Sequence, residues 1–223
     1  MHSRIIDFVL FYPLFLFSLS FHEAAHAYIA DKFGDPTAKL LGRISLSPFP
    51  HMDLIGTVIL PSIGILTGAP VIGWGKPVPV NPYRLKGEAR KSNLWVAIAG
   101  PASNILLALV FAALVRLFVA LLPSLPMSWL VSGSIGATIF GGMYAIFEMG
   151  VVLNLVLAVF NLLPMPPLDG GSVLRGILPA SSLDSFDRFS RYSFMILLVL
   201  FVTGLLRYIL VPVLYVAGFL LPS

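Results

Sequence analysis

Long apolar segments separated by short polar stretches make up most of this chain. An α-helix rises about 1.5 Å per residue, so roughly 20 apolar residues in a row can cross the hydrocarbon core of a bilayer. The segments of this kind are residues 5–31, 94–122, 134–163 and 189–207, followed by a 14-residue apolar tail from Tyr208 and joined by a more broken apolar stretch over 54–73. The pattern predicts an all-α polytopic membrane protein with about five to six membrane segments.

Two stretches between the first long segment and the segment at 94–122 have the character of strands. Residues 43–47 alternate between polar and apolar side chains, and residues 76–80 carry two valines between prolines. These features predict two short β-strands, and Pro77 and Pro79 confine the second strand to the edge of a sheet. Such an edge would allow another extended chain to pair with it.

The apolar stretch at 54–73 is interrupted by glycine and proline at five positions: Gly56, Pro61, Gly64, Gly68 and Pro70. If the stretch enters the membrane and returns, 11 of the 14 lysines and arginines share one side. Because positive residues favour the cytoplasmic side, this arrangement predicts a re-entrant segment and a basic cytoplasmic face. A re-entrant backbone must face protein or a water-filled cavity, so it would form the wall of a polar site within the membrane. A plain spanning helix kinked at Pro61 is the alternative.

Composition agrees with a membrane setting. Hydrophobic residues make up 58% of the chain, charged residues 11%, and the mean hydropathy is +0.95. Without a long polar stretch, residues 1–223 are expected to form a single membrane-embedded domain. A net charge of +4 is too small to indicate a nucleic-acid partner. The chain has no cysteine, so any metal must be held by imidazole and carboxylate groups.

Three ionisable residues lie inside the first apolar segment, in the sequence His22-Glu23-Ala24-Ala25-His26. On a helix the H-E-x-x-H spacing places two imidazoles on one face, where both can bind one metal ion, and Glu23 beside them can carry protons. A charged residue at mid-membrane costs about 2.5–3.5 kcal/mol on insertion scales, so this cluster is unlikely to occur by chance. The motif predicts a metal site within the membrane.

A catalytic zinc site usually has three protein ligands, so one more is required. The candidates are His51, Asp53, Glu148 and Asp169. Geometry favours Asp169, because the helix at 134–163 returns to the cytoplasmic side and is ended by a run of prolines immediately before this residue. Gly170 and Gly171 then allow a sharp turn that aims the carboxylate inward. Asp53 is expected to cap the following segment, and His51 to lie in a solvated loop.

Four other polar residues lie within or at the end of apolar segments: Asn104, Asn154, Asn161 and Glu148. Two of them, Asn104 and Glu148, have both a structural and a functional interpretation. Asn104 could orient the substrate backbone or help hold an oxyanion, or it could form a hydrogen bond between helices. Asn154 is expected to be structural, and Asn161 to brace the turn at Asp169. Glu148 is expected to be neutral and hydrogen-bonded, with substrate gating or proton access as the alternative.

The chain resembles the site-2 proteases, which are intramembrane zinc metalloproteases, in their compact bacterial form without a PDZ or regulatory domain. The resemblance rests on Phe21-His22-Glu23-Ala24-Ala25-His26, on Ala99-Gly100-Pro101-Ala102-Ser103-Asn104, and on the stretch from Asn161 to Gly171. It implies a three-helix catalytic core, one zinc ion held by His22, His26 and Asp169, and Glu23 as general base and acid. It also implies cleavage in or near a transmembrane helix of the substrate.

The sequence therefore predicts an intramembrane zinc endopeptidase that acts on membrane-protein substrates during regulated intramembrane proteolysis. It is expected in the cell membrane with its active site toward the cytoplasm. Two other classes of function also place His and carboxylate groups in lipid or bind helices: a metal transporter or sensor, and an inactive helix-binding scaffold. Replacing Glu23 by Gln distinguishes them, because only the enzyme would keep its metal and lose cleavage.

Overall fold

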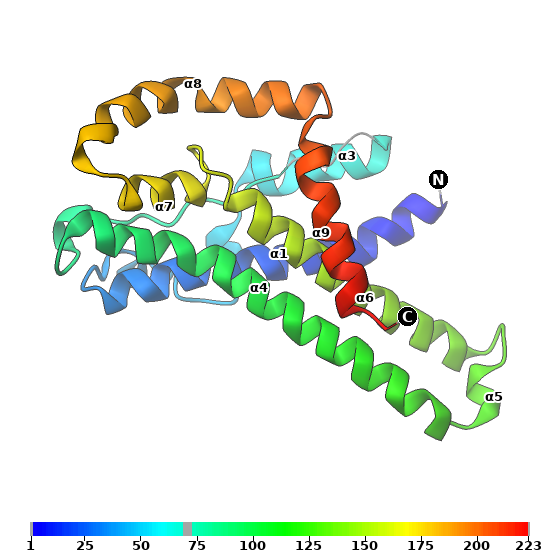
Figure 1. Cartoon of the computed structure of the whole chain (residues 1–223). Helices are drawn as coiled ribbons and strands as arrows, with labels where there is room; N and C mark the ends of the chain where they lie inside the picture. Colours follow the sequence, from blue (N-terminus) through cyan, green and yellow to red (C-terminus); the bar gives the residue numbers. More distant parts are fainter. Residues whose placement is uncertain (1, 69–72, 223) are drawn as a thin grey trace.

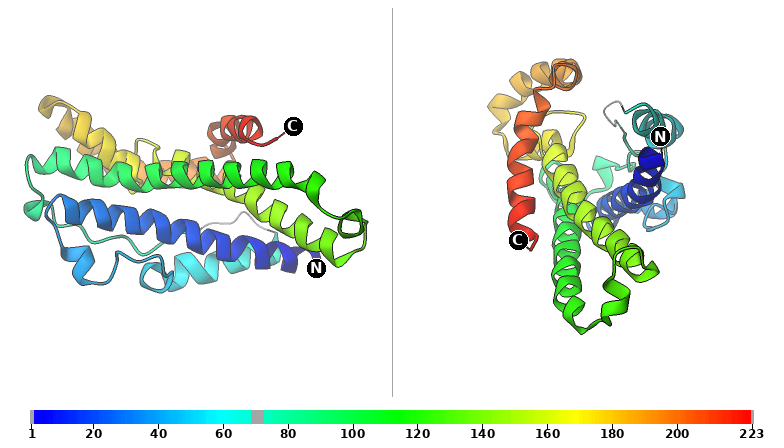
Figure 2. Two further views of the ribbon diagram at one scale, coloured as in Figure 1. Left: turned by 90° about the horizontal axis from the view of Figure 1, so that it is seen from below. Right: turned by 90° about the vertical axis from the view of Figure 1, so that its right-hand side faces the viewer.

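The computed structural model describes residues 2–68 and 73–222, and three long helices form its core. They are α1 (His2–Lys32), α4 (Ala89–Leu121) and α6 (Ile135–Asn161). Helix α4 packs against both of the others and runs antiparallel to them (Figures 1 and 2). The core that they bury is aliphatic and aromatic, and includes Leu14, Phe15, Leu107, Phe111, Val151 and Leu155.

Shorter helices connect and cover this core. Between α1 and α4 lie α2 (Thr37–Leu40), η1 (Phe49–His51), the π-helix η2 (Leu54–Ile59), α3 (Leu60–Thr67) and η3 (Pro82–Arg84). Between α4 and α6 lie η4 (Leu122–Ser124) and α5 (Met127–Leu130). After α6 come α7 (Asp169–Ile177), η5 (Ala180–Ser182), α8 (Leu183–Val202) and α9 (Leu206–Leu220).

Three helices are long and apolar enough to cross a membrane, namely Phe8–Lys32, Ala89–Ser124 and Ile135–Asn161. The last two helices, Ala180–Val202 and Leu206–Leu220, are bent by 72° at the break between them and count as one further candidate at most. The predicted helical class is therefore correct, and the described residues provide three or four spanning helices. The predicted count of five to six membrane segments is not confirmed.

The two ends of the apolar stretch that follows Asp53 lie next to each other, because the chain after it returns to residues 51–56. Asp53 caps it as predicted, because its Oδ1 accepts hydrogen bonds from the backbone N–H groups of Ile55 and Gly56. The returning chain donates from Trp74 N to Gly56 O at 3.1 Å and from Lys76 N to His51 O at 2.8 Å. Its apolar helix, Leu54–Gly64, is shorter than the three spanning candidates. Pro70, one of the predicted interruptions, lies outside the described residues.

The two predicted β-strands do not form. Residues 43–47 and 76–80 are both described, and neither is a strand. Pro77 and Pro79 lack an N–H group, so the second segment cannot form a regular ladder. The carbonyl of Lys76 accepts a hydrogen bond from the Arg43 guanidinium instead. A side chain thus links the two segments where a backbone ladder was expected.

Gly75, which directly precedes segment 76–80, is packed closely against α1. A Cβ at Gly75 would lie 3.1–3.2 Å from the side chain of Leu19 on α1. Further along, the buried carboxylate of Asp35 accepts a hydrogen bond from Asn81 N at 2.6 Å and another from Thr37 N at 3.1 Å. These contacts hold the polar connections against the C-terminal half of α1, where the H-E-x-x-H motif lies.

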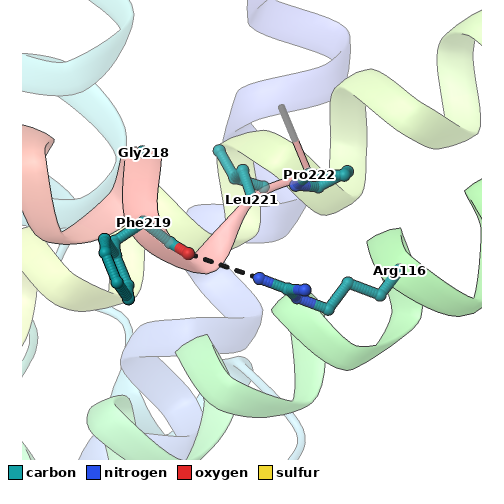
Figure 3. Close-up of a pocket in the computed structure, with 5 residues that line it drawn as sticks. All are labelled: Arg116, Gly218, Phe219, Leu221 and Pro222. Carbon is teal, nitrogen blue, oxygen red and sulfur yellow. Dashed lines mark hydrogen bonds between the residues drawn. The ribbon is translucent and has the colours of Figure 1, made fainter.

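The far end of α9 is fastened to α4 by one side chain. The Arg116 guanidinium donates from Nε to the carbonyl of Leu220 at 3.0 Å. It also donates from Nη2 to the carbonyl of Phe219 at 3.3 Å (Figure 3). An open cavity of about 520 Å³ lies beside it. Its lining contains no metal-ligating group. Arg116 is also about 24 Å along α4 from Gly100, which contacts the two histidines.

Candidate metal centre

Two imidazoles and one carboxylate meet between α1 and α7. The Nε2 atoms of His22 and His26 are 3.0 Å apart, and Oδ2 of Asp169 lies 3.1 Å from the first and 3.3 Å from the second. Both histidines are buried, with 5% and 8% of their surfaces exposed. Among the described residues these three form the one group of His, Cys, Asp or Glu side chains close enough to share a metal ion.

The outer nitrogen of each ring is engaged by another helix. Nδ1 of His26 lies 2.7 Å from the carbonyl of Val96 on α4, and Nδ1 of His22 lies 2.6 Å from Oδ1 of Asn104. A carbonyl oxygen can only accept, so His26 carries its proton on Nδ1, and the amide oxygen of Asn104 requires the same of His22. Both Nε2 atoms of the neutral rings therefore present lone pairs to the centre.

This arrangement fits a zinc ion. Oδ2 of Asp169 is buried and accepts no hydrogen bond, so three lone-pair donors face one another without a proton between them. Two ligands at about 2.0–2.1 Å from a tetrahedral ion are separated by roughly 3.3 Å, close to the spacing found here. His22, His26 and Asp169 would hold the ion and leave its fourth position open.

Gly100 on α4 forms the floor of this site. A Cβ at this position would lie 2.6 Å from both Cε1 and Nε2 of His22, and closer still to Nε2 of His26. Every larger residue would therefore occupy the space in which the two imidazoles meet. Helix α4 begins at Ala89, five residues before the predicted apolar segment 94–122, so Gly100 and Asn104 lie well inside it.

The chain brings Asp169 to the histidines by a tight return after α6. Asp169 is the first residue of α7 rather than part of an irregular loop. A Cβ at Gly170 would overlap the carbonyls of Leu162 and Leu163, and one at Gly171 would lie 2.6 Å from the nitrogen of Pro166. Neither glycine has a positive φ. They are needed for this close approach of α7 to the preceding loop, not for the sharp turn that the sequence predicted.

Glu23 lies beside the centre, between the two histidines in the sequence of α1. Its side chain is 92% buried, since 8% of its surface is exposed, and within the described part of the chain it has no hydrogen-bond or ion-pair partner. Arg43 and His51, in the connection between α2 and η2, both interact electrostatically with Glu23. A carboxylate without a fixed partner can accept a proton and release it again.

His51 is not in a solvated loop, as the sequence predicted, but is 1% exposed. Its Nε2 donates a hydrogen bond to the carbonyl of Ser45 at 2.8 Å. Burial lowers the pKa of His51 and the charge of Arg43 lowers it further, while the Ser45 carbonyl and Glu23 act in the opposite direction. The loop of residues 45–51 is therefore packed around a neutral imidazole.

The other polar residues singled out by sequence occupy varied positions. Asn104 is fully buried, and its nitrogen donates to Oδ1 of Asn154 at 2.9 Å and to the carbonyl of Ser18 at 3.4 Å. Asn161 donates to Leu157 O within its own helix, and it makes no bond to the Asp169 turn among the residues described. Glu148 is exposed and has no hydrogen-bond partner in that part of the chain, contrary to expectation.

Comparison with known proteins identifies the family. The model of peptidase family M50 matches residues 10–204, most of the chain. The chain belongs to peptidase family M50. This M50 peptidase is 39% identical over 219 residues to the Bacillus subtilis protein named "Putative zinc metalloprotease YwhC", covering 94% of this chain and 91% of that one. It is 28% identical to "Putative zinc metalloprotease Rip2" of Mycolicibacterium smegmatis, covering 90% and 69% respectively. No solved structure matches it.

The family confirms the main sequence predictions at a coarse level. This M50 peptidase is a zinc metalloendopeptidase of the site-2 protease type, and its apolar helices make it a multi-pass membrane protein. The resemblance drawn from three separated motifs was therefore correct.

Proposed function

We propose that this M50 peptidase is a single-domain intramembrane protease, spanning residues 1–223, that hydrolyses peptide bonds in or near the transmembrane helices of other membrane proteins. The observation that carries the proposal is the depth of the two histidine ligands within a helix that is long and apolar enough to span a membrane. His26 and His22 lie six and ten residues before Lys32, the end of the spanning segment Phe8–Lys32. At about 1.5 Å per residue, they are roughly 9 and 15 Å inside that end.

In this proposal each residue of the site has a distinct role. His22, His26 and Asp169 hold zinc, which when bound acidifies a water molecule and polarises a carbonyl group. Glu23 accepts a proton from the attacking water and donates it to the leaving amine of the cleaved peptide bond. Asn104 orients the His22 ring. Its two N–H groups are already used by Asn154 and Ser18, so the interhelical role is preferred over the oxyanion role.

A substrate helix must unwind before cleavage, because its peptide groups are otherwise occupied by internal hydrogen bonds. The extended segment 76–80 is a candidate guide for the unwound chain. Its start packs near Leu19, one turn before His22. Among the described residues, neither the N–H nor the C=O of Val78 in this segment has a hydrogen-bond partner. The proposal that an unwound substrate pairs with a backbone edge therefore rests on segment 76–80 alone, because no sheet is formed there.

The same proposal orients the chain in the cell membrane with its active site toward the cytoplasm. Basic residues gather at the end of α1, on α2, at the start of α4 and in the last turn of α7, for example Lys32, Lys39, Arg90, Lys91 and Arg175. Cytoplasmic segments carry such an excess of positive charge. The stretch 54–67 then becomes a re-entrant segment, supported by the hydrogen bond that returns the chain from Lys76 to His51.

A comparison of membrane-protein fragments tests this function. Cells carrying the wild-type chain are expected to accumulate fragments ending within or beside a transmembrane helix, and cells carrying Glu23→Gln to accumulate the uncleaved precursors. Quantitative mass spectrometry of membrane fractions measures both, with Glu88→Gln, an exposed carboxylate outside the site, as the control. Identical fragment sets in the wild-type and Glu23→Gln cells would exclude the proposed function.

A further inference from the structure

Three fully buried polar side chains form a connected chain of hydrogen bonds beneath the metal centre. Ser18 on α1, Asn104 on α4 and Asn154 on α6 each have 0% of their surface exposed. Their hydrogen bonds link the three core helices, which pack against one another. Buried polar groups in an apolar bundle are costly unless they are bonded, so a network of this kind needs a specific role.

The Gly150 carbonyl fixes the orientation of the Asn154 amide, and this in turn fixes the direction of the other hydrogen bonds in the network. The amide nitrogen of Asn154 donates to the backbone carbonyl of Gly150 at 2.9 Å, and a carbonyl can only accept. The same nitrogen donates to the Ser18 hydroxyl oxygen at 3.0 Å. The amide oxygen of Asn154 is therefore turned toward Asn104, whose nitrogen donates to it at 2.9 Å.

Asn104 passes this orientation to the metal ligand. Its nitrogen is held by Asn154 and by the carbonyl of Ser18, so its oxygen must face His22. That oxygen lies 2.6 Å from Nδ1 of His22. The proton of the neutral imidazole is consequently placed on Nδ1, and the lone pair of Nε2 points to Nε2 of His26 and to Asp169. If Asn104 were flipped, its amide oxygen would face the amide oxygen of Asn154, and two acceptors would meet at that contact.

We propose that Asn154, supported by Ser18 and the Gly150 carbonyl, is a positioning residue for zinc that acts through Asn104 on the tautomer and orientation of His22. This inference rests on the proposed ligand set. His26 needs no such chain, because the Val96 carbonyl fixes its tautomer directly. The dependence on α6 is therefore specific to His22.

Zinc affinity tests the proposal on the full chain in detergent, by competition with a chromogenic chelator. Partners of metal-ligating histidines contribute about 10- to 100-fold to metal affinity. Asn104→Ala is expected to fall within this range, and Asn154→Leu, which keeps the number and branching of the side-chain heavy atoms, near its lower end at about 10-fold. Ser18→Ala removes a single hydroxyl and is expected to weaken affinity by less than Asn154→Leu.

A matched control separates positioning from packing. Ser20 is also buried on α1, but its hydroxyl donates only to Leu16 O within the same helix. Ser20→Ala is therefore expected to keep the wild-type zinc affinity. The thermal unfolding of each zinc-free variant shows whether the fold is retained. A loss of affinity in Ser18→Ala with an unfolding temperature equal to that of Ser20→Ala supports the proposal even if Asn154→Leu is unstable.

The double variant gives the sharpest test. If Asn154 acts only through Asn104, adding Asn154→Leu to Asn104→Ala should cause no further loss of zinc affinity. Additive losses would overturn the proposal, as would wild-type affinity in both Asn154→Leu and Ser18→Ala. His22→Ala is the reference. If it keeps wild-type affinity, the proposed ligand set is wrong, whereas a loss in His22→Ala with no loss in the network variants overturns this inference alone.

Discussion

Gly100→Ala is expected to weaken zinc binding although it changes no charged or ligating group. The added methyl group would lie 2.6 Å from Nε2 of His22 and closer still to Nε2 of His26. Because α4 is packed on both sides by α1 and α6, the helix cannot withdraw to make room. We expect zinc affinity to fall by more than about 10-fold, at least the effect of losing a histidine's hydrogen-bond partner.

Zinc content measured by elemental analysis, together with peptide-bond cleavage, checks this expectation. Gly142→Ala on α6 is the matched control, because a Cβ at Gly142 would meet nothing within 4 Å. Ala also favours a helix over Gly by about 0.8–1.0 kcal/mol, so neither change should unfold its helix through propensity. A Gly100→Ala protein with full zinc content and full activity would show that the histidines do not meet against this face of α4.

Glu23→Gln is expected to separate catalysis from metal binding. Glutamine has nearly the same shape as glutamate but cannot accept a proton, so the loss should appear in kcat with zinc content unchanged. General acid–base groups contribute about 10²- to 10⁴-fold, and we expect cleavage to slow by that factor. The absence of a fixed hydrogen-bond partner for Glu23 within the described residues agrees with such a mobile proton carrier.

Single-turnover cleavage of a membrane substrate in proteoliposomes measures this rate. Glu88→Gln, on the exposed surface at the start of α4, should cleave at the wild-type rate. If Glu23→Gln retained near wild-type turnover, the general-base role would have to be given up. If it lost zinc as well, Glu23 would contribute to the metal site rather than to proton transfer alone.

The first half of the metal site was readable from sequence because helix geometry alone determines it. His22 and His26 are one turn apart on one continuous helix, and no tertiary contact is needed to place them on one face. Asp169 required an argument about topology: the prolines after Asn161 end α6, and the antiparallel order of the core helices returns the chain to the same level. The prolines can be read directly from the sequence, and the antiparallel order follows from the predicted order of the membrane segments.

Contacts between distant backbones could not be predicted in this way. Gly100 approaches the imidazoles closely, and Gly170 approaches the carbonyls of Leu162 and Leu163. Whether a Cβ fits at either position depends on differences of a few tenths of an ångström in the distance between backbone segments, which the sequence does not reveal. The Val96 carbonyl that fixes His26 has no signature in the side-chain sequence. The strand predictions failed because alternation describes a possible pairing, and here the Arg43 side chain took the place of a partner strand.

The central claim is that His22, His26 and Asp169 together bind zinc inside the helical bundle, and zinc K-edge X-ray absorption of the purified protein tests it most directly. We predict one zinc per chain with two imidazole nitrogens and at least one oxygen at about 2.0–2.2 Å, and loss of stoichiometric zinc in Asp169→Ala. A wild-type spectrum without two imidazole ligands, or full zinc occupancy in Asp169→Ala, would contradict it.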